Sequence, residues 1–313
     1  MPAFKFSEVA DMKYWIMILL ALLLTGCAGK RSTFYVDATE TTLQETSAQT
    51  MPQETVRSPE LPERELLTAL VNPRDEDFVR IRDYIPDVQV ELKYAAADNF
   101  TRQRVYDFED VFLRYGTVMK LKAVAEELAE QGIGIKIWDG FRPVSAQFRL
   151  WEICPDDTYV ANPNKGYSNH SRGFAVDLTL VDSQGAEVEM PTEFDDFSGK
   201  ADRDYSDCSE TARNNAQLLE SIMEKHGFQG YWGEWWHFND THKYDVETCF
   251  DPGVICSRKT AAETVLLEVF WDESSEILKI PAGEQVTLLG YDEGFVLAEY
   301  WGYRGYMPMD CLK

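Results

Sequence analysis

Hydrophobic residues in the middle of the chain follow first a helical and then a strand period. Between Val111 and Gln131 they recur at helical spacing up to Gly132, a natural helix stop, which predicts a helix there. Residues 133–137 and 174–180 alternate apolar and other side chains, which predicts two strands. Residues 209–226 again have helical spacing. Because helices and strands are interspersed and form no regular βαβ units, the sequence predicts an α+β fold.

From about residue 260 the pattern changes to short apolar runs separated by glycine and proline. These runs predict a small all-β, barrel-like segment over residues 258–313. The sequence Gly-Tyr-Arg-Gly-Tyr-Met at 302–307 resembles bacterial SH3-like domains. The alternative is a β extension that packs on the preceding part of the chain.

The N-terminus carries an apolar run of 11 residues, Tyr14–Leu24. That is too short for a spanning helix, which needs about 20 residues. A lysine precedes the run and small residues follow it, so residues 1–26 are predicted to be a signal peptide. Residues 24–27, Leu-Thr-Gly-Cys, resemble the lipobox of bacterial lipoproteins, which implies export and acylation of Cys27. The alternative is a signal anchor or a chance apolar run, and Met12 would make a more ordinary start.

Residues 27–73 are rich in Thr, Ser, Glu, Gln and Pro and show no apolar periodicity. This composition predicts a disordered tether. Its root-mean-square span is roughly 35–40 Å, and about 150 Å when fully extended. Such a tether could carry a folded domain, predicted over residues 74–257, from a membrane into a cell wall.

Composition excludes one class of partner. The formal net charge is −24, so nucleic acid and anionic lipid surfaces are disfavoured, and membrane contact is expected only through the lipid on Cys27.

Five cysteines remain besides Cys27. In an oxidising compartment some should pair, and Cys249 and Cys256 are the nearest in sequence, but the connectivity stays open.

The candidate chemistry lies around two histidines. His170 precedes Asp177 by seven residues, and His237 follows Glu234 by three. A hydrolytic zinc site needs three N or O ligands and one open position. His170, Asp177 and His237 fill that requirement, which leaves Glu234 free to act as general base toward the attacking water.

Each histidine taken alone is more often a structural residue than a ligand. His237 could pack between Trp236 and Phe238 as a core residue. His226 fits a helix C-terminus and His242 a polar loop, and both are interpreted as structural. The two half-motifs together predict a metal site.

A third motif is Asp-Gly-Phe-Arg-Pro at residues 139–143. The residue before a proline is pushed out of the α region, so Arg142 should project from an extended segment just past a strand end. A fixed guanidinium there could stabilise a developing oxyanion by about 3–4 kcal/mol. The alternative is a surface salt bridge.

These motifs resemble one family. The pattern S-x-H-x-x-G-x-A-x-D at 168–177, preceded by 139–143 and followed by E-x-x-H at 234–237, is similar to the D-alanyl-D-alanine dipeptidases of the VanX type. Residues 92–101 look like the N-terminal pocket segment of that family. The resemblance covers about residues 75–250.

The resemblance implies an α+β zinc peptidase domain with a central, mainly antiparallel sheet flanked by helices. It implies one Zn²⁺ per chain, held by His170, Asp177 and His237, with Glu234 as base and Arg142 stabilising the transition state. In the family an Asp of a Phe-Asp-x-Phe segment binds the ammonium of the dipeptide, and Asp195 stands at that position. Ser168 and Tyr94 look like pocket-wall residues that contact the substrate.

The leading hypothesis is therefore zinc-dependent hydrolysis of the dipeptide D-alanyl-D-alanine to two D-Ala in cell-wall peptide turnover. A close alternative is a D,D-carboxypeptidase that trims peptidoglycan stem peptides. A third hypothesis is a catalytically idle lipoprotein that binds peptidoglycan through its C-terminal segment. The best-known family members act in the cytoplasm, whereas this chain is predicted to be exported to the periplasmic or outer-membrane face of a bacterial membrane.

Overall fold

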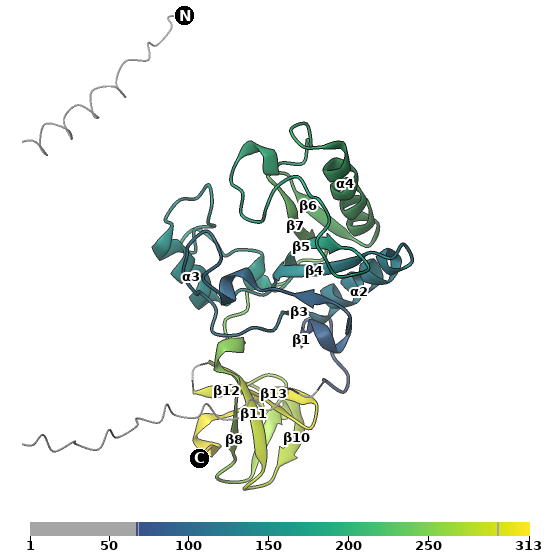
Figure 1. Cartoon of the computed structure of the whole chain (residues 1–313). Coiled ribbons are helices and arrows are strands. Elements are labelled where there is room, and N and C mark those ends of the chain that lie inside the picture. The colour runs from purple at the N-terminus through teal and green to yellow at the C-terminus, as the bar shows by residue number, and fades with distance from the viewer. Residues whose placement is uncertain (1–66, 68, 293) are drawn as a thin grey trace, which may run out of the picture. The chain divides into compact units, whose positions relative to one another are not determined.

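The computed structural model of the protein describes residues 67, 69–292 and 294–313 (Figure 1). The predicted signal peptide, Cys27 and nearly all of the predicted tether lie outside these residues. Among the described residues no helix has both the length and the apolar character that a membrane span requires.

A five-stranded sheet forms the centre of the main body. Its strand order is β2-β4-β5-β7-β6, in which β2 and β4 are parallel and all other neighbours antiparallel. Helices α2 and α4 contact each other and the sheet, and Figure 1 shows α3 apart from them. The strands are β2 (Gln89–Val90), β4 (Gly134–Asp139), β5 (Ala175–Val181), β6 (Phe228–Tyr231) and β7 (Glu234–Asp240), and the helices are α2 (Tyr115–Ala129), α3 (Val144–Ile153) and α4 (Glu210–Lys225).

The predicted elements of the main body agree with the structure in kind and differ at their ends. The helix predicted from Val111 begins only at Tyr115, because residues 112–114 form strand β3, whose three side chains are all buried. Helix α4 begins after Ser209, whose hydroxyl accepts a hydrogen bond from the backbone N–H of Ala212 at 3.0 Å. The strand β3 (Phe112–Arg114) pairs antiparallel with β1 (Phe78–Arg80) in a separate two-stranded sheet.

Helix α3 has no counterpart among the predicted elements. Its apolar residues Val144, Ala146, Phe148 and Leu150 alternate with a period of two, so its sequence lacks the helical spacing by which the other two helices were predicted.

The C-terminal residues form a second sheet with its own small core. All neighbours in it are antiparallel, and the strand order is β10-β9-β13-β12-β11-β8. The predicted apolar runs lie on these strands, whereas the likeness to SH3-like domains stays a prediction. The strands are β8 (Cys256–Lys259), β9 (Thr264–Leu267), β10 (Glu276–Ile280), β11 (Gln285–Asp292), β12 (Phe295–Tyr300) and β13 (Tyr303–Pro308).

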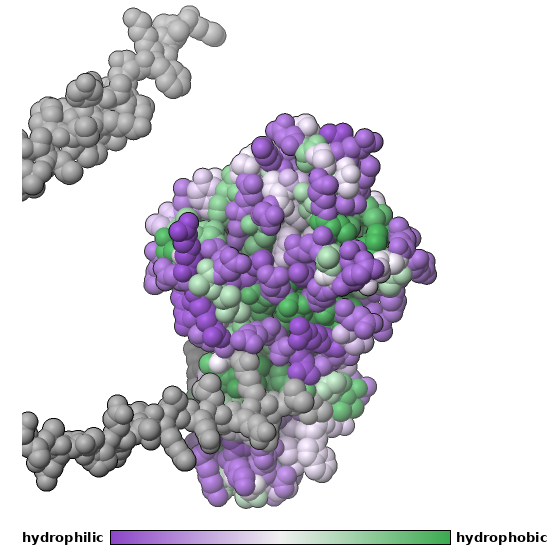
Figure 2. Space-filling model, in the orientation of Figure 1, coloured by the Kyte–Doolittle hydropathy of each residue, from purple (hydrophilic) through white to green (hydrophobic). Residues whose placement is uncertain are grey.

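An aromatic cluster joins the two-stranded sheet of β1 and β3 and the segment after β4 to the C-terminal strands. The ring of Phe78 lies 4.4 Å from that of Phe141 and 4.8 Å from that of Phe250, and Leu289 and Leu297 complete the cluster. Figure 2 shows apolar side chains gathered where these parts meet, below a largely hydrophilic face. The cluster matters for function because Phe141 is the immediate neighbour of Arg142.

Four of the five cysteines in the described part of the chain, Cys154, Cys208, Cys256 and Cys311, are free thiols. The sequence left the connectivity open, and because Cys256 is free, the two cysteines nearest in sequence, Cys249 and Cys256, do not pair. Cys249 belongs to the aromatic cluster at the junction, whereas Cys256 packs against the core of the C-terminal sheet. The two side chains therefore pack in different places, Cys249 buried and Cys256 partly exposed.

Candidate metal centre and substrate pocket

Two neighbouring strands and one turn position the three predicted ligands. Asp177 on β5 is the direct cross-strand partner of His237 on β7, so their side chains stand on the same face. His170 lies in a short 3-10 turn, residues 170–172, that leads into β5. The turn ends at Gly173, which has φ +77° and faces Phe78 so closely that a Cβ would lie 2.4 Å from its ring.

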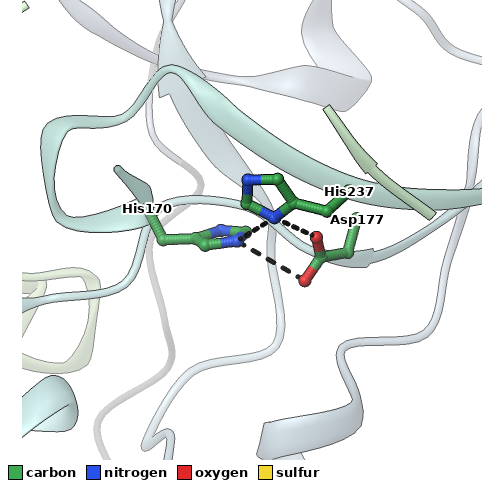
Figure 3. Close-up of side chains that lie close together, drawn as sticks. All are labelled: His170, Asp177 and His237. Atoms are coloured by element: carbon green, nitrogen blue, oxygen red, sulfur yellow. Dashed lines mark hydrogen bonds and ion pairs between the residues drawn. The ribbon is translucent and has the colours of Figure 1, made fainter. Parts of the chain in front are cut away.

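The ligand atoms of these three residues converge (Figure 3). His170 Nε2 lies 3.2 Å from His237 Nδ1 and 3.5 Å from Asp177 Oδ2, and His237 Nδ1 lies 2.9 Å from Asp177 Oδ1. Within the described residues this is the one group of His, Cys, Asp and Glu side chains whose ligand atoms could hold a metal ion together.

The hydrogen bonds of the two rings turn their lone pairs toward one point. His170 Nδ1 donates to the carbonyl oxygen of Gly140 at 2.8 Å, so in the neutral ring Nε2 carries the lone pair. His237 Nε2 donates to Asn239 Oδ1 at 3.2 Å, so in the neutral ring the lone pair is on Nδ1. Asn169 Nδ2 also donates to Asn239 Oδ1, at 2.9 Å, and so fixes that oxygen as the acceptor.

Three lone-pair donors that face each other repel unless a cation lies between them. Tetrahedral coordination at about 2.0–2.2 Å separates ligand atoms by roughly 3.3–3.6 Å. The two separations from His170 Nε2, 3.2 and 3.5 Å, are close to this range, and the third, 2.9 Å, is shorter. Burial opposes charge on Asp177, and protons on the rings of His170 and His237, which take the place of a cation when none is bound, lower the pKa of its carboxyl below the usual range. Two nitrogens and one carboxylate therefore fit a divalent ion such as zinc.

Glu234 lies beside this group. Its Oε2 is 3.8 Å from His237 Nδ1. Burial raises the pKa of the Glu234 carboxyl, and His237 opposes that effect. A carboxyl with a raised pKa next to three candidate metal ligands has the placement and the basicity of a general base.

Arg142 is buried, so the interpretation as a surface salt bridge is wrong. Its Nη2 donates to Asp139 Oδ2 at 2.6 Å, its Nη1 to Gln147 at 2.9 Å and its Nε to the Tyr106 hydroxyl at 3.2 Å. Burial opposes the charge of Arg142, but Tyr106 and Asp139 hold its pKa well above the usual value. The guanidinium is thus permanently charged and fixed in position.

Asp195 is held in an unusual backbone conformation at the pocket. Its φ of 59° is left-handed, a strained value for a residue other than glycine. Its carboxylate accepts a hydrogen bond from the Tyr94 hydroxyl at 3.1 Å. Burial raises the pKa of Asp195 well above its ordinary value, and the charge of Asp177 adds to the shift.

One cavity of about 340 Å³ collects the predicted site residues. Its size is near the lower end of the range for small-molecule sites. Ser168, which accepts a hydrogen bond from the backbone N–H of His170 at 3.2 Å, stands at its wall. The cavity is lined by Tyr94, Arg142, Ser168, His170, Asp177, Asp195, Glu234 and His237.

Sequence reasoning missed the residues that hold this set in place. Asp139 is fully buried and also accepts hydrogen bonds from the Tyr106 hydroxyl and the Gly140 amide. Because Asp139 precedes Arg142 by three residues in the same motif, their ion pair could have been predicted from the sequence. Asn239 could have been found as the residue two positions after His237, on the same face of a strand.

Comparisons with known proteins agree with the geometry. The family described as D-ala-D-ala dipeptidase matches residues 74–252. A D-alanyl-D-alanine dipeptidase of Escherichia coli is 37% identical over 162 residues, 52% of this chain and 83% of that protein. One of Enterococcus faecium is 34% identical, over 51% of this chain and 90% of that protein. A solved structure of the D,D-pentapeptidase VanY with Zn(II) is 16% identical over 42% of this chain and 74% of that one, with a TM-score of 0.29, too low to support an argument.

The hydrogen bond from His237 to Asn239 should matter for metal binding. We expect Asn239→Ala to weaken the affinity for Zn²⁺ by about 10–100-fold, because His237 Nδ1 loses its fixed lone pair. Competition with a chromogenic chelator measures this affinity. Asn164→Ala is the control, since Asn164 is exposed and donates its hydrogen bonds to Asn162. Equal affinities for the two variants would contradict the role of Asn239.

Proposed function

The chain belongs to the D-alanyl-D-alanine dipeptidase family of metallopeptidases, and we propose that it hydrolyses D-alanyl-D-alanine to two D-Ala. The single observation that carries the proposal is the convergence of His170, Asp177 and His237 with Glu234 3.8 Å from the ring nitrogen of His237. Zinc, the metal of this family, would be held by these three residues, one ion per chain. A protein that only bound cell wall would have no use for the base.

Each residue of the site has its own role in the proposed reaction. When bound, zinc supplies Lewis acidity that polarises the scissile carbonyl and favours ionisation of water. Glu234 accepts the proton of the attacking water and then delivers it to the leaving amine. Arg142 stabilises the negative charge that develops on the carbonyl oxygen.

Arg142 has N–H donors that are not used in its contacts with Asp139, Gln147 and Tyr106 and that could stabilise the developing oxyanion. Its three side-chain acceptors engage one N–H on each guanidinium nitrogen. A guanidinium has five N–H donors, so a second N–H remains on Nη1 and on Nη2. Since Arg142 lines the cavity, these two can face the substrate.

Asp195 is assigned to the ammonium of the substrate. Its carboxylate accepts a hydrogen bond from the Tyr94 hydroxyl, and the ring of Tyr94 lies 6.2 Å from that of Phe100 and 6.1 Å from that of Phe194. A half-buried carboxylate beside such an aromatic group favours a small zwitterion with a free amino end over a longer stem peptide. This supports the dipeptidase over the D,D-carboxypeptidase.

The reaction and the role of Glu234 are tested together. Purified protein loaded with zinc should hydrolyse D-alanyl-D-alanine faster than a pentapeptide stem, and chelation should abolish the activity. Glu234→Gln should lower kcat by about 10²–10⁴-fold with zinc still bound, because only the proton acceptor is lost. Glu152→Gln, at an exposed position outside the cavity, is the control. Preference for the stem would favour the carboxypeptidase, and a fully active Glu234→Gln variant would contradict the mechanism.

A pH dependence follows from the raised pKa of Asp195. As the pH falls through that pKa the carboxylate becomes neutral and loses its attraction for the ammonium, so KM should rise toward acid pH. Asp195→Asn should remove this dependence and weaken binding by about 2–5 kcal/mol, or roughly 30-fold and more. Steady-state kinetics at several pH values measure both effects. Equal hydrolysis of the dipeptide and its N-acetyl derivative would rule out the assigned role.

We further propose that the protein is exported and held by a lipid on Cys27 at the periplasmic or outer-membrane face of a bacterial membrane. The C-terminal sheet would then contact peptidoglycan. Its exposed tryptophans, Trp271 and Trp301, 76% and 75% exposed, support a carbohydrate or peptide contact there. In a producing bacterium, palmitate should label the wild type and the Cys311→Ala control and leave Cys27→Ala unlabelled. Labelling that persists in Cys27→Ala would contradict the anchor.

A further inference from the structure

Glu234 and His237 occupy an unexpected pair of positions on strand β7. They are three residues apart, and a regular strand would point two such side chains to opposite faces. Both nevertheless line the same cavity, with 3.8 Å between Glu234 Oε2 and His237 Nδ1. The strand must therefore be irregular between them.

The irregularity is an enlarged bulge of β7 opposite the end of β6, the edge strand beside β7 in Figure 1. Gly230 pairs with Phe238, but the next residue, Tyr231, pairs with Glu234. Residues 235–237 consequently have no partner on β6. Such a bulge leaves carbonyl groups outside the ladder, and these need another donor.

Arg203 supplies the donors. Its Nη2 donates to the carbonyl oxygens of Trp235 and His237, at 3.0 and 2.9 Å. Its Nε donates to the carbonyl oxygen of Tyr231 at 2.8 Å, and its backbone N–H to that of Trp232 at 3.0 Å. One residue thus binds the hairpin on both sides of Glu234.

The guanidinium is itself held from three directions. Its carbon lies 4.3 Å from the ring centre of Phe238, and Nη1 lies 3.2 Å from Glu220 on α4. It occupies the space beside Gly230, where a Cβ would lie 2.3 Å from Arg203 Cζ. A planar group with donors in a fixed fork meets these contacts, whereas a lysine ammonium could reach only part of them.

We infer that Arg203 is a positioning residue that holds the bulge of β7 and thereby places Glu234 and His237 on one face. Arg203 does not line the cavity, so it acts through the hairpin that it binds. The inference rests on the proposed roles of Glu234 as base and His237 as ligand.

Two substitutions disturb this contact in different ways. Arg203→Lys keeps the charge and loses the fork, and Gly230→Ala keeps Arg203 but displaces its guanidinium. We expect both to lower kcat by up to about 100-fold with little change in KM, because Asp195 and Tyr94 lie on other segments. Both should also weaken Zn²⁺ affinity by about 10–100-fold, measured by chelator competition. Arg213→Lys is the control. Arg213 lies on α4, and its Nε donates to the carbonyl oxygen of Tyr205, two residues after Arg203, instead of to a residue of β7.

A purely structural role would lower the melting temperature and leave kcat and metal affinity of the folded protein unchanged, and that result would overturn the inference. If Arg203→Ala folds, added methylguanidinium should restore part of its kcat, and no restoration would also count against it. Metal affinity is measured without substrate. The two proposals can therefore fail separately. If the wild type does not hydrolyse the dipeptide but both variants bind zinc more weakly than the wild type, the proposed function is refuted and the role of Arg203 in placing His237 is retained.

Discussion

The whole site depends on one electrostatic constraint: two imidazole nitrogens and a carboxylate face each other in a buried place, with their protons directed elsewhere. Such an arrangement is unfavourable by itself and favourable around a cation. The surrounding structure serves to maintain it. The carbonyl of Gly140 orients one ring, Asn239 orients the other, and the pairing of β5 with β7 fixes the third ligand beside the second.

The second charged group of the site is connected to the first through a short segment of chain. Asp139 ends β4 and pairs with Arg142, while Gly140 between them binds the ring of His170. Phe141 in the same segment packs into the aromatic cluster that includes side chains of the C-terminal sheet. The C-terminal strands thus support the loop that carries Arg142, whatever else they bind. This gives a physical reason for a small peptidase body to retain an additional sheet packed against it.

The sequence was sufficient to predict that His170, Asp177 and His237 come together, because each half-motif joins residue types that serve one chemistry at a fixed spacing. It was also sufficient for helix α4, where apolar spacing and the Ser209 cap agree. It could not predict α3, whose apolar residues alternate like those of a strand, or the burial of Arg142, which depends on Gln147 and Tyr106 from other segments. Least predictable was the bulge of β7, because it arises from contacts with Arg203 that lie about 30 residues away in the chain.

The most direct test of the central claim is an X-ray absorption spectrum of the zinc-loaded protein, combined with the stoichiometry of bound metal. The arrangement of His170, Asp177 and His237 predicts one ion per chain, bound by two imidazole nitrogens and one carboxylate oxygen, with a light atom in the remaining position and no sulfur. Sulfur in the coordination shell, or an unchanged spectrum after His237→Ala, would contradict it.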